Sequence, residues 1–324
     1  MTSSPQLTVR GRYAERAVPG RDAGKIFAAM NQIQRIRQAV AHLKTTRDFL
    51  LHRKPAGRQM TVLPDDLFIV SYPKSGNTWT RFLLGNLIYQ DEPVTFRNIE
   101  SRIPSIYLFS DRQLLRLPRI FKSHDCFDPR YKKVIYIVRD PRDVTVSAYH
   151  YSIKVKLLPD RCPMEEFVPL FMSGTFGAGL LADPRWGSWY DNVSSWLAMQ
   201  HSRKFLLLRY EDMLDNAARE LHKVADFLGI EATPGRIQRA VELSSADKMR
   251  EMEKSQSKDW QLTKETRQDK PFVRKARAGG WKSEMSEAAA LRVEAGWGDL
   301  MLRLGYALAG LPVVAENSAV ATPK

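Results

Sequence analysis

Short runs rich in apolar residues alternate with helical patterns through the middle of the chain. Runs too short for helices predict four strands, at residues 67–72, 119–123, 134–138 and 205–210. Apolar residues spaced three or four positions apart predict helices near 77–89, 141–154, 184–201, 216–228, 234–243 and 286–303. Apolar strands that alternate with helices predict one α/β domain, whose central, mainly parallel sheet is flanked by helices. In such sheets, ligands bind at the carboxyl ends of the strands.

Two regions depart from this alternation. Residues 23–53 have apolar positions at helical spacing among many bases, which predicts a basic amphipathic helix that either packs on its own domain or contacts a membrane surface or a partner. Residues 254–284 hold nine bases, few apolar positions and a Gly-Gly pair, so we expect a long loop that is functional or disordered. The predicted organisation is a basic extension over 1–60, an α/β domain over 61–310 and a disordered tail over 311–324.

Length and charge narrow the possible partners. A chain of 324 residues with 44% apolar content is long enough to bury one large core. Fifty basic residues against 36 acidic ones give a net charge of +14, which favours a polyanion or an anionic small molecule as partner. Residues 1–60 carry 12 bases and 3 acids, so most of this excess lies outside the part of the chain that holds the motifs.

Cysteines and apolar segments bear on the compartment. Cys126 and Cys162 are too few for a disulfide scaffold and lack the spacing of a metal site, which favours a reduced compartment and no metal. No apolar stretch approaches the ~18 residues that a membrane-spanning helix needs, and residues 1–21 lack the apolar core of a signal peptide. We therefore expect a soluble protein of the cytoplasm.

The sequence SYPKSGNTW, at 71–79, joins the first predicted strand to the first predicted helix. Pro73 ends the strand and Gly76 permits a tight turn. The amides that follow open a helix, whose unpaired N–H groups and dipole favour an anion such as phosphate. Lys74 adds a positive charge; the alternative is an ordinary turn with a solvated lysine. The loop is not a Walker A motif, which has two glycines with its lysine after the second.

A second polar turn follows the predicted strand at 134–138. Arg139 stands at the strand end, Asp140 is suited to cap the next helix, and Ser147 lies two turns into that helix. A guanidinium at this strand end is suited to grip a second phosphate through two hydrogen bonds. Alternatively, Arg139 pairs with Asp140 or Asp143 and only braces the turn.

Five segments together resemble the sulfotransferase family, which uses 3′-phosphoadenosine 5′-phosphosulfate (PAPS) as its sulfuryl donor. SYPKSGNTW and the stretch 139–147 are similar to its two nucleotide-binding signatures. FKSHD at 121–125 resembles its catalytic Lys-x-His segment, LRYEDM at 208–213 its adenine-side strand end, and RKARAGGWK at 274–282 its C-terminal loop. The similarity spans about residues 65–305. It implies a PAPS-dependent sulfotransferase with a phosphate-binding loop after the first core strand.

The resemblance also implies which residues hold the donor. Its 5′-phosphosulfate would lie on the loop formed by Lys74, Ser75, Gly76, Asn77 and Thr78. Its adenine would contact Trp79 and Tyr210. Its 3′-phosphate would be bound by Arg139, Ser147, Arg274, Lys275 and the backbone at Ala276. Two basic sites would thus match the two anionic ends that distinguish this donor from ATP.

The chain departs from the family pattern at three places. Ala276 stands where the family usually has glycine, which matters if the backbone there needs a positive φ or a close approach to the phosphate. Gly280 replaces a common aspartate. Asp125 and Cys126 replace the Leu-Pro pair that often follows the catalytic histidine in animal members, so the difference is expected on the acceptor side.

Three side chains are expected to carry the transfer. An imidazole ordinarily titrates near neutrality, so His124 would act as general base on the acceptor, an effect worth roughly 10²- to 10⁴-fold. The alternative is a structural histidine that is hydrogen-bonded to the backbone. Lys74 and Lys122 would stabilise the moving sulfuryl group and the leaving phosphate, so the scheme requires no metal.

The acceptor has no recognisable motif. We expect a hydroxyl or an amine of a small molecule, and the aromatic segment 186–197 is expected either to pack in the core or to contribute to the acceptor pocket. Two other functions stay open: a small-molecule kinase, disfavoured by the missing Walker motif, and a nucleic-acid or anionic-membrane binder that acts through residues 1–60. The sequence contains no recognisable nucleic-acid-binding module, and no nucleic-acid partner is expected.

Overall fold

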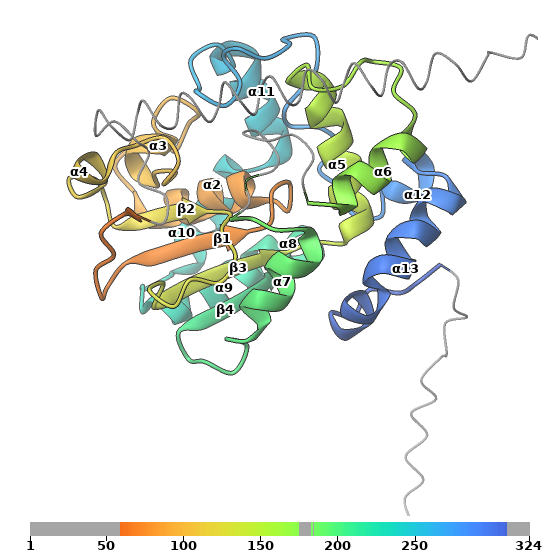
Figure 1. Ribbon diagram of the computed structural model, residues 1–324. Coiled ribbons are helices and arrows are strands. Elements are labelled where there is room, and N and C mark those ends of the chain that lie inside the picture. The colour runs from red at the N-terminus through yellow and green to blue at the C-terminus, as the bar shows by residue number, and fades with distance from the viewer. Residues whose placement is uncertain (1–58, 175–182, 184, 310–324) are drawn as a thin grey trace, which may run out of the picture.

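The computed structural model describes residues 59–174, 183 and 185–309 (Figure 1). The predicted basic helix at 23–53 and the predicted tail at 311–324 lie outside the described residues, as does nearly all of the predicted extension over 1–60. The described residues thus cover most of the predicted α/β domain.

Four parallel strands form the centre of the domain. They are β1 (Leu67–Ser71), β2 (Ile120–Ser123), β3 (Lys133–Val138) and β4 (Phe205–Arg209). Their order in the sheet is β2-β1-β3-β4, and every neighbouring pair is parallel. The predicted fold class is confirmed. Because the strands are parallel, their carboxyl ends meet at one edge of the sheet (Figure 1).

Alternate residues of β1 are buried in two different apolar clusters. Phe68 and Val70 pack in a cluster with residues of four helices, α5 (Pro141–Lys154), α6 (Met164–Met172), α7 (Trp189–Leu197) and α13 (Glu287–Arg303). Leu67 and Ile69 pack with residues of α2 (Asn77–Ile88), α9 (Ala217–Leu228) and α10 (Pro234–Leu243). Because successive side chains of a strand point to opposite faces, helices cover both faces of the sheet.

A third apolar cluster lies beside α2. Phe82 of α2 packs with Phe96, Trp260 and Met249, which belongs to α11 (Ala246–Gln256). The short helices of the described residues are α3 (Ile99–Arg102), α4 (Asp111–Leu114), α8 (Tyr210–Asp215) and α12 (Trp281–Glu284). The third cluster holds α11 against the helix that follows β1, which brings the C-terminal part of the chain to the same end of the sheet as the first loop.

Three element predictions are wrong in detail. The helix expected from 184 begins only at Trp189, because the hydroxyl of Ser188 accepts a hydrogen bond from the N–H of Asp191 and caps the helix there. Tyr210 does not end a strand but opens α8. The loop expected over 254–284 is shortened by α11 and α12. The apolar pattern of α11 is weak because its buried residues are Met249 and Glu253.

Candidate active site

The loop between β1 and α2 has the shape of an anion site. Lys74 and Gly76 both have left-handed backbone conformations, with φ of 71° and 101°. Gly76 is the N-cap of α2, and no side chain caps this helix, so N–H groups at its N-terminus remain for a ligand. Only glycine fits at this position, because a Cβ would lie 2.5 Å from Cδ2 of Tyr210.

Two polar side chains of this loop differ in role. Asn77 Nδ2 donates hydrogen bonds to the carbonyl of Ile69 (3.2 Å) and to Oγ of Ser71 (3.3 Å), so the side chain ties the loop to β1. Ser75 is fully buried, and its hydroxyl has no hydrogen-bond partner among the described residues. Buried hydroxyls normally have a partner, and an anion bound in the loop would provide one.

The ammonium of Lys74 lies over two aromatic rings. Its Nζ is 4.0 Å from the ring centre of Tyr151 and 4.8 Å from that of Phe272. Burial lowers the pKa of Lys74 to about 7, and the charges of Arg139 and Arg274 lower it in the same direction. A bound anion would oppose this shift because it stabilises the charged ammonium.

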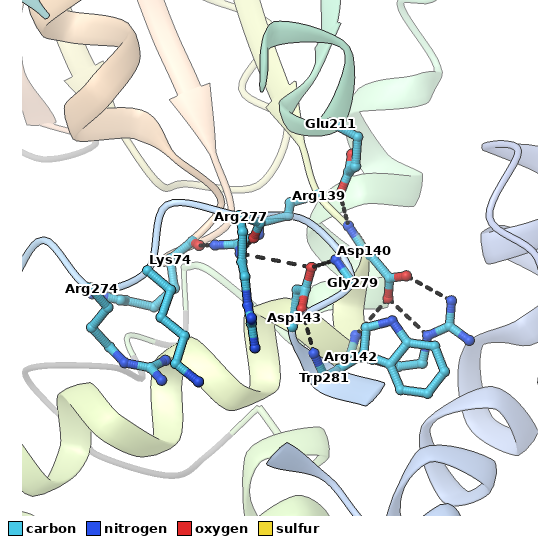
Figure 2. A network of polar contacts seen from close by, with 12 residues as sticks. Lys74, Arg139, Asp140, Arg142, Asp143, Glu211, Arg274, Arg277, Gly279 and Trp281 are labelled. Carbon is cyan, nitrogen blue, oxygen red and sulfur yellow. Dashed lines mark hydrogen bonds and ion pairs between the residues drawn. The ribbon is translucent and has the colours of Figure 1, made fainter. Parts of the chain in front are cut away.

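Arg139 follows β3 and links the first loop to the C-terminal segment (Figure 2). Its Nη1 donates to the carbonyl of Lys74 (3.4 Å) and its Nη2 to the carbonyl of Arg277 (3.1 Å). The guanidinium lies over the ring of Tyr210, 4.2 Å from its centre, and 3.8 Å from a carboxylate oxygen of Asp143. Its Nε is buried without a hydrogen-bond partner among the described residues. Arg139 therefore does brace the turn, but it also keeps a donor for a ligand.

Asp143 fastens the C-terminal segment to α5, as Figure 2 shows. Its carboxylate accepts hydrogen bonds from the N–H of Gly279 (2.8 Å) and of Trp281 (2.9 Å). Asp140 instead caps α5 and forms an ion pair of 2.6 Å with Arg142. The two aspartates of this turn thus hold different parts of the site, and the pairing of Arg139 with Asp140 is not formed.

The long C-terminal segment between α11 and α12 is held at several further points. Lys154 of α5 donates hydrogen bonds from Nζ to the carbonyls of Arg267 (3.0 Å) and Lys270 (2.5 Å). Glu253 of α11 accepts a hydrogen bond of 2.5 Å from the N–H of Phe272. Of the two expectations for this segment, functional or disordered, its described contacts favour a functional one, because they fix it beside the first loop.

Two departures from the family pattern lie in this segment. Ala276 has a φ of 47°, so the positive φ that the family pattern suggests is present without glycine. Such a conformation costs a residue with a Cβ about 1–2 kcal/mol. At Gly280, a Cβ would lie 3.3 Å from Nε of Arg277 and 3.5 Å from Oδ1 of Asp143, so the space that a larger residue would need is occupied.

A cavity of about 420 Å³ lies between these groups. Of the residues predicted to hold the donor, it is lined by Gly76, Thr78, Trp79, Arg139, Ser147, Tyr210, Arg274, Lys275 and Ala276. Trp79 and Tyr210 meet edge to face with ring centres 5.6 Å apart, and Trp79 Nε1 donates to the carbonyl of Ser244 (2.9 Å), which fixes this aromatic wall. The volume is in the range of small-ligand pockets, roughly 300–1,000 Å³. Lys74, Ser75 and Asn77 belong to the adjoining loop but do not line the cavity.

His124 lies just past the carboxyl end of β2 and is almost completely buried. Its Nδ1 is 2.7 Å from the carbonyl of Ser71, and because a carbonyl only accepts, Nδ1 carries the proton. Nε2 is then the basic nitrogen, and no hydrogen bond from the described residues reaches it. Burial lowers the pKa of His124 well below its usual value, and the charge of Lys122 adds to this effect. The imidazole is therefore neutral at pH 7 and able to accept a proton.

Aromatic rings surround His124. The ring centre of Trp186 lies 5.4 Å from that of the imidazole, and the ring of Tyr107 is nearly parallel to the imidazole at 6.1 Å. The hydroxyl of Tyr107 accepts hydrogen bonds from the N–H of His124 (2.7 Å) and from Nε1 of Trp186 (3.1 Å). In the aromatic segment, Trp189 and Trp196 are fully buried in the core, whereas Trp186 lies against His124.

Lys122 and Asp125 flank His124 in the chain and meet the same tyrosine. Nζ of Lys122 lies 5.2 Å from the ring centre of Tyr107, and the hydroxyl of Tyr107 donates to Oδ1 of Asp125 (2.9 Å). Burial lowers the pKa of Lys122 to about 7, with Arg81 acting in the same direction. The aspartate that departs from the family pattern thus helps to hold the wall beside His124.

Sequence reasoning did not identify several residues of the site. Phe272, Arg277 and Glu284 line the cavity, and Tyr107 holds the wall beside His124 in place. Asp143 was expected only as a partner of Arg139, not as the residue that fastens the C-terminal segment. Arg277 lies inside RKARAGGWK, so the number of bases in that motif is a signal for it. Phe272, Glu284 and Tyr107 carry no local signal, because their roles depend on contacts with distant segments.

Other site classes are limited by the described residues. Among residues 59–174, 183 and 185–309, no group of three His, Cys, Asp or Glu side chains is placed to hold a metal ion. In the same ranges, no helix is both long enough and apolar enough to cross a bilayer. No disulfide joins Cys126 and Cys162.

Comparisons with known proteins agree with this geometry. The sequence model of the family described as "Sulfotransferase domain" matches residues 64–305. Rat sulfotransferase 1E1 is 31% identical over 252 residues, which cover 71% of this chain and 81% of that protein, and rat sulfotransferase 1A1 is 30% identical over 263 residues, with 75% and 87% covered. The crystal structure of the mouse sulfotransferase SULT7A1 complexed with PAP has a TM-score of 0.61 and 25% identity, and the match covers 76% of this chain and 87% of that chain. The chain therefore belongs to the sulfotransferase family, which confirms the predicted PAPS-dependent enzyme class.

Proposed function

We propose that this chain transfers a sulfuryl group from PAPS to a hydroxyl or an amine of a small-molecule acceptor, with His124 as general base. The observation that carries the proposal is the cavity of about 420 Å³, with bases contributed by segments far apart in the sequence. Arg139 comes from the end of β3, and Arg274 and Lys275 come from the C-terminal segment. A ligand with two separated anionic groups is the natural partner of this cavity and the adjoining loop.

The donor contacts follow from the residues present. The loop over 74–78 would take the 5′-phosphosulfate, for which the buried hydroxyl of Ser75 and the uncapped start of α2 offer donors. Trp79 and Tyr210 would pack on the adenine. Arg139, Ser147, Arg274, Lys275 and the backbone at Ala276 would bind the 3′-phosphate. The crystallised mouse relative is complexed with PAP, the product of PAPS after transfer, which supports these assignments.

Three side chains would serve the transfer itself. PAPS supplies an activated sulfuryl group to the acceptor. His124 would accept the acceptor proton at Nε2, while the bond from Nδ1 to Ser71 keeps the ring oriented. The pKa values of Lys74 and Lys122 are lowered to about 7. Their charged ammonium groups would stabilise the negative charge that develops on the sulfuryl group and the leaving phosphate.

The aromatic side chains beside His124 indicate the kind of acceptor. Trp186 and Tyr107 beside His124 favour an acceptor with an apolar or aromatic body next to its hydroxyl or amine.

A cytoplasmic location, contact of residues 1–60 with a membrane surface or a partner, and a disordered tail over 311–324 stay predictions. Deletion of residues 1–60 tests whether this extension contacts a membrane surface. If the shortened chain no longer binds anionic vesicles but still binds nucleotide, the extension is an accessory to the enzyme and serves membrane contact.

The proposed function is tested by binding and transfer. We expect PAP, adenosine 3′,5′-bisphosphate, to bind the full chain in calorimetry, and we expect radiolabel to pass from labelled PAPS to members of a panel of phenols, alcohols and amines. Absence of any PAP binding would contradict the proposal. Magnesium-dependent consumption of ATP with phosphate transfer to the same panel would instead favour the small-molecule kinase.

A further inference from the structure

Glu284 places a carboxylate among the bases that the proposed function assigns to the 3′-phosphate. Its Oε2 is 2.6 Å from Nη2 of Arg274, and its Oε1 is 2.9 Å from Nζ of Lys275. Nε2 of His150, on α5, donates to the same Oε2 at 2.8 Å. Three donors from two distant segments therefore converge on one carboxylate at the wall of the cavity.

The contacts of Glu284 are those that a phosphate needs. A guanidinium and an ammonium bridged by two oxygens of one anion form a common phosphate site. The carboxylate takes up Nη2 of Arg274 and one donor of Lys275, so a phosphate has to displace it or share these groups with it. The side chain of Glu284 is only 15% exposed, which means that solvent screens its charge incompletely.

The carboxylate is charged at neutral pH. Burial alone would raise the pKa of Glu284, but the hydrogen bonds and charges of Lys275, Arg274 and His150 outweigh burial and hold the pKa at about 2. Repulsion between this carboxylate and an arriving phosphate is therefore present over the whole neutral range.

Building on the proposed function, we infer that Glu284 is an internal competitor for the 3′-phosphate. It occupies Arg274 and Lys275 in the free protein and lowers the affinity for every nucleotide that carries this phosphate, donor and product alike. Glu284 thereby sets how strongly the enzyme distinguishes 3′-phosphorylated nucleotides from those without that group. The opposite role, a brace that orients Arg274 for the phosphate, predicts the opposite sign of effect.

The test compares Glu284→Gln with the unaltered chain, using PAP and adenosine 5′-monophosphate as ligands in calorimetry. These ligands differ only by the 3′-phosphate. Removal of one like charge beside the phosphate is expected to tighten PAP binding about tenfold and to change binding of the monophosphate by less than about twofold. Glu284→Asp keeps the charge and is expected to stay closer to the unaltered chain.

Glu287→Gln is the matched control. Glu287 is exposed at the start of α13, three residues further along, and its change removes the same charge from the protein without touching Arg274. It is expected to leave both affinities unchanged. Circular dichroism checks that each variant is folded, and Glu284→Ala provides a second variant with the same expected sign.

Three outcomes would overturn the inference. PAP binding that neither Glu284→Gln nor Glu284→Ala tightens would exclude the competitor, and weaker binding by both would show a brace. An equal gain for PAP and the monophosphate would show a general effect of charge. Failure of the unaltered chain to bind PAP would remove the proposed function itself, and the inference would fall with it.

Discussion

The two ends of the proposed donor site use their bases in different ways. At the 3′-phosphate end, Arg139 donates to backbone carbonyls and Arg274 pairs with Glu284. At the transfer end, Lys74 and Lys122 lie against aromatic rings, and no ion pair within the described residues engages them. Their pKa values are lowered to about 7, mainly by burial.

This difference separates binding from chemistry. Arginine stays charged at every physiological pH, so the 3′-phosphate end attracts its anion under all conditions. For a buried lysine that forms no close ion pair among the described residues, the charged ammonium is less stable than in water until a negative charge lies beside it. The transfer end is therefore expected to respond to pH and to the charge that develops during reaction, whereas the 3′-phosphate end is not.

The largest effect is expected from removing the base at the transfer end. His124→Ala is predicted to lower kcat by roughly 10²- to 10⁴-fold, because no other group would take the acceptor proton at that position. PAP affinity is predicted to change by less than about twofold. Single-turnover transfer and calorimetry measure the two quantities. His201→Ala, at an exposed histidine, is the control, and substantial turnover by His124→Ala would exclude the role as base.

Removal of an arginine at the other end should act on binding. Arg139→Ala is predicted to lower the affinity for PAP about thirtyfold or more. The substitution removes a partly buried charge that faces the phosphate, and it also removes the hydrogen bonds by which Arg139 links two loops. The rate with saturating PAPS should fall much less than in His124→Ala. Arg303→Ala, at an exposed arginine, is the control. Near-normal PAP affinity in Arg139→Ala would contradict the division of roles between the two ends.

The pH dependence of PAP affinity tests the lysines of the transfer end. A bound anion keeps Lys74 protonated, whereas the free protein loses this proton above about pH 7, so binding must take up a proton at higher pH. Affinity is therefore predicted to fall about tenfold or more between pH 7 and pH 9. Calorimetry at several pH values measures this fall.

A substitution that keeps the charge sharpens the pH test. Lys74→Arg should make the profile shallower, because the guanidinium does not lose its proton in this range and only Lys122 of the two lysines still titrates. Lys258→Arg, at an exposed lysine, should leave the profile as it is. A flat profile in the unaltered chain would mean that Lys74 does not face the nucleotide.

The smallest effect is expected from the backbone at Ala276. Ala276→Gly relieves the strain of a positive φ but makes the unfolded chain more flexible, so the net gain in unfolding free energy is predicted at about 0.5–1 kcal/mol. Thermal unfolding measures it. Ala278→Gly, in the same segment without a positive φ, should destabilise the protein instead. A loss of stability in Ala276→Gly would show that the strain is compensated locally.

Local signals account for much of what could be predicted. The helices over 141–154 and 234–243 agree with the structure to the residue, because proline at the first helical turn and an N-cap residue, Asp140 or Thr233, mark their starts. The loop after β1 was predicted because its glycine, its lysine and the following helix are adjacent in sequence. α11, whose buried face is sparse, gave no such signal.

The parallel sheet, the two turns at strand ends and the family could all be predicted, because short contiguous segments carry the signals for them. How these parts meet could not, because it depends on contacts between distant segments. The tautomer of His124 depends on a carbonyl of β1, and the attachment of the C-terminal segment depends on Asp143. The charge balance at the 3′-phosphate end depends on Glu284. Burial and contacts between segments far apart in the chain create these properties, so no local sequence pattern predicts them.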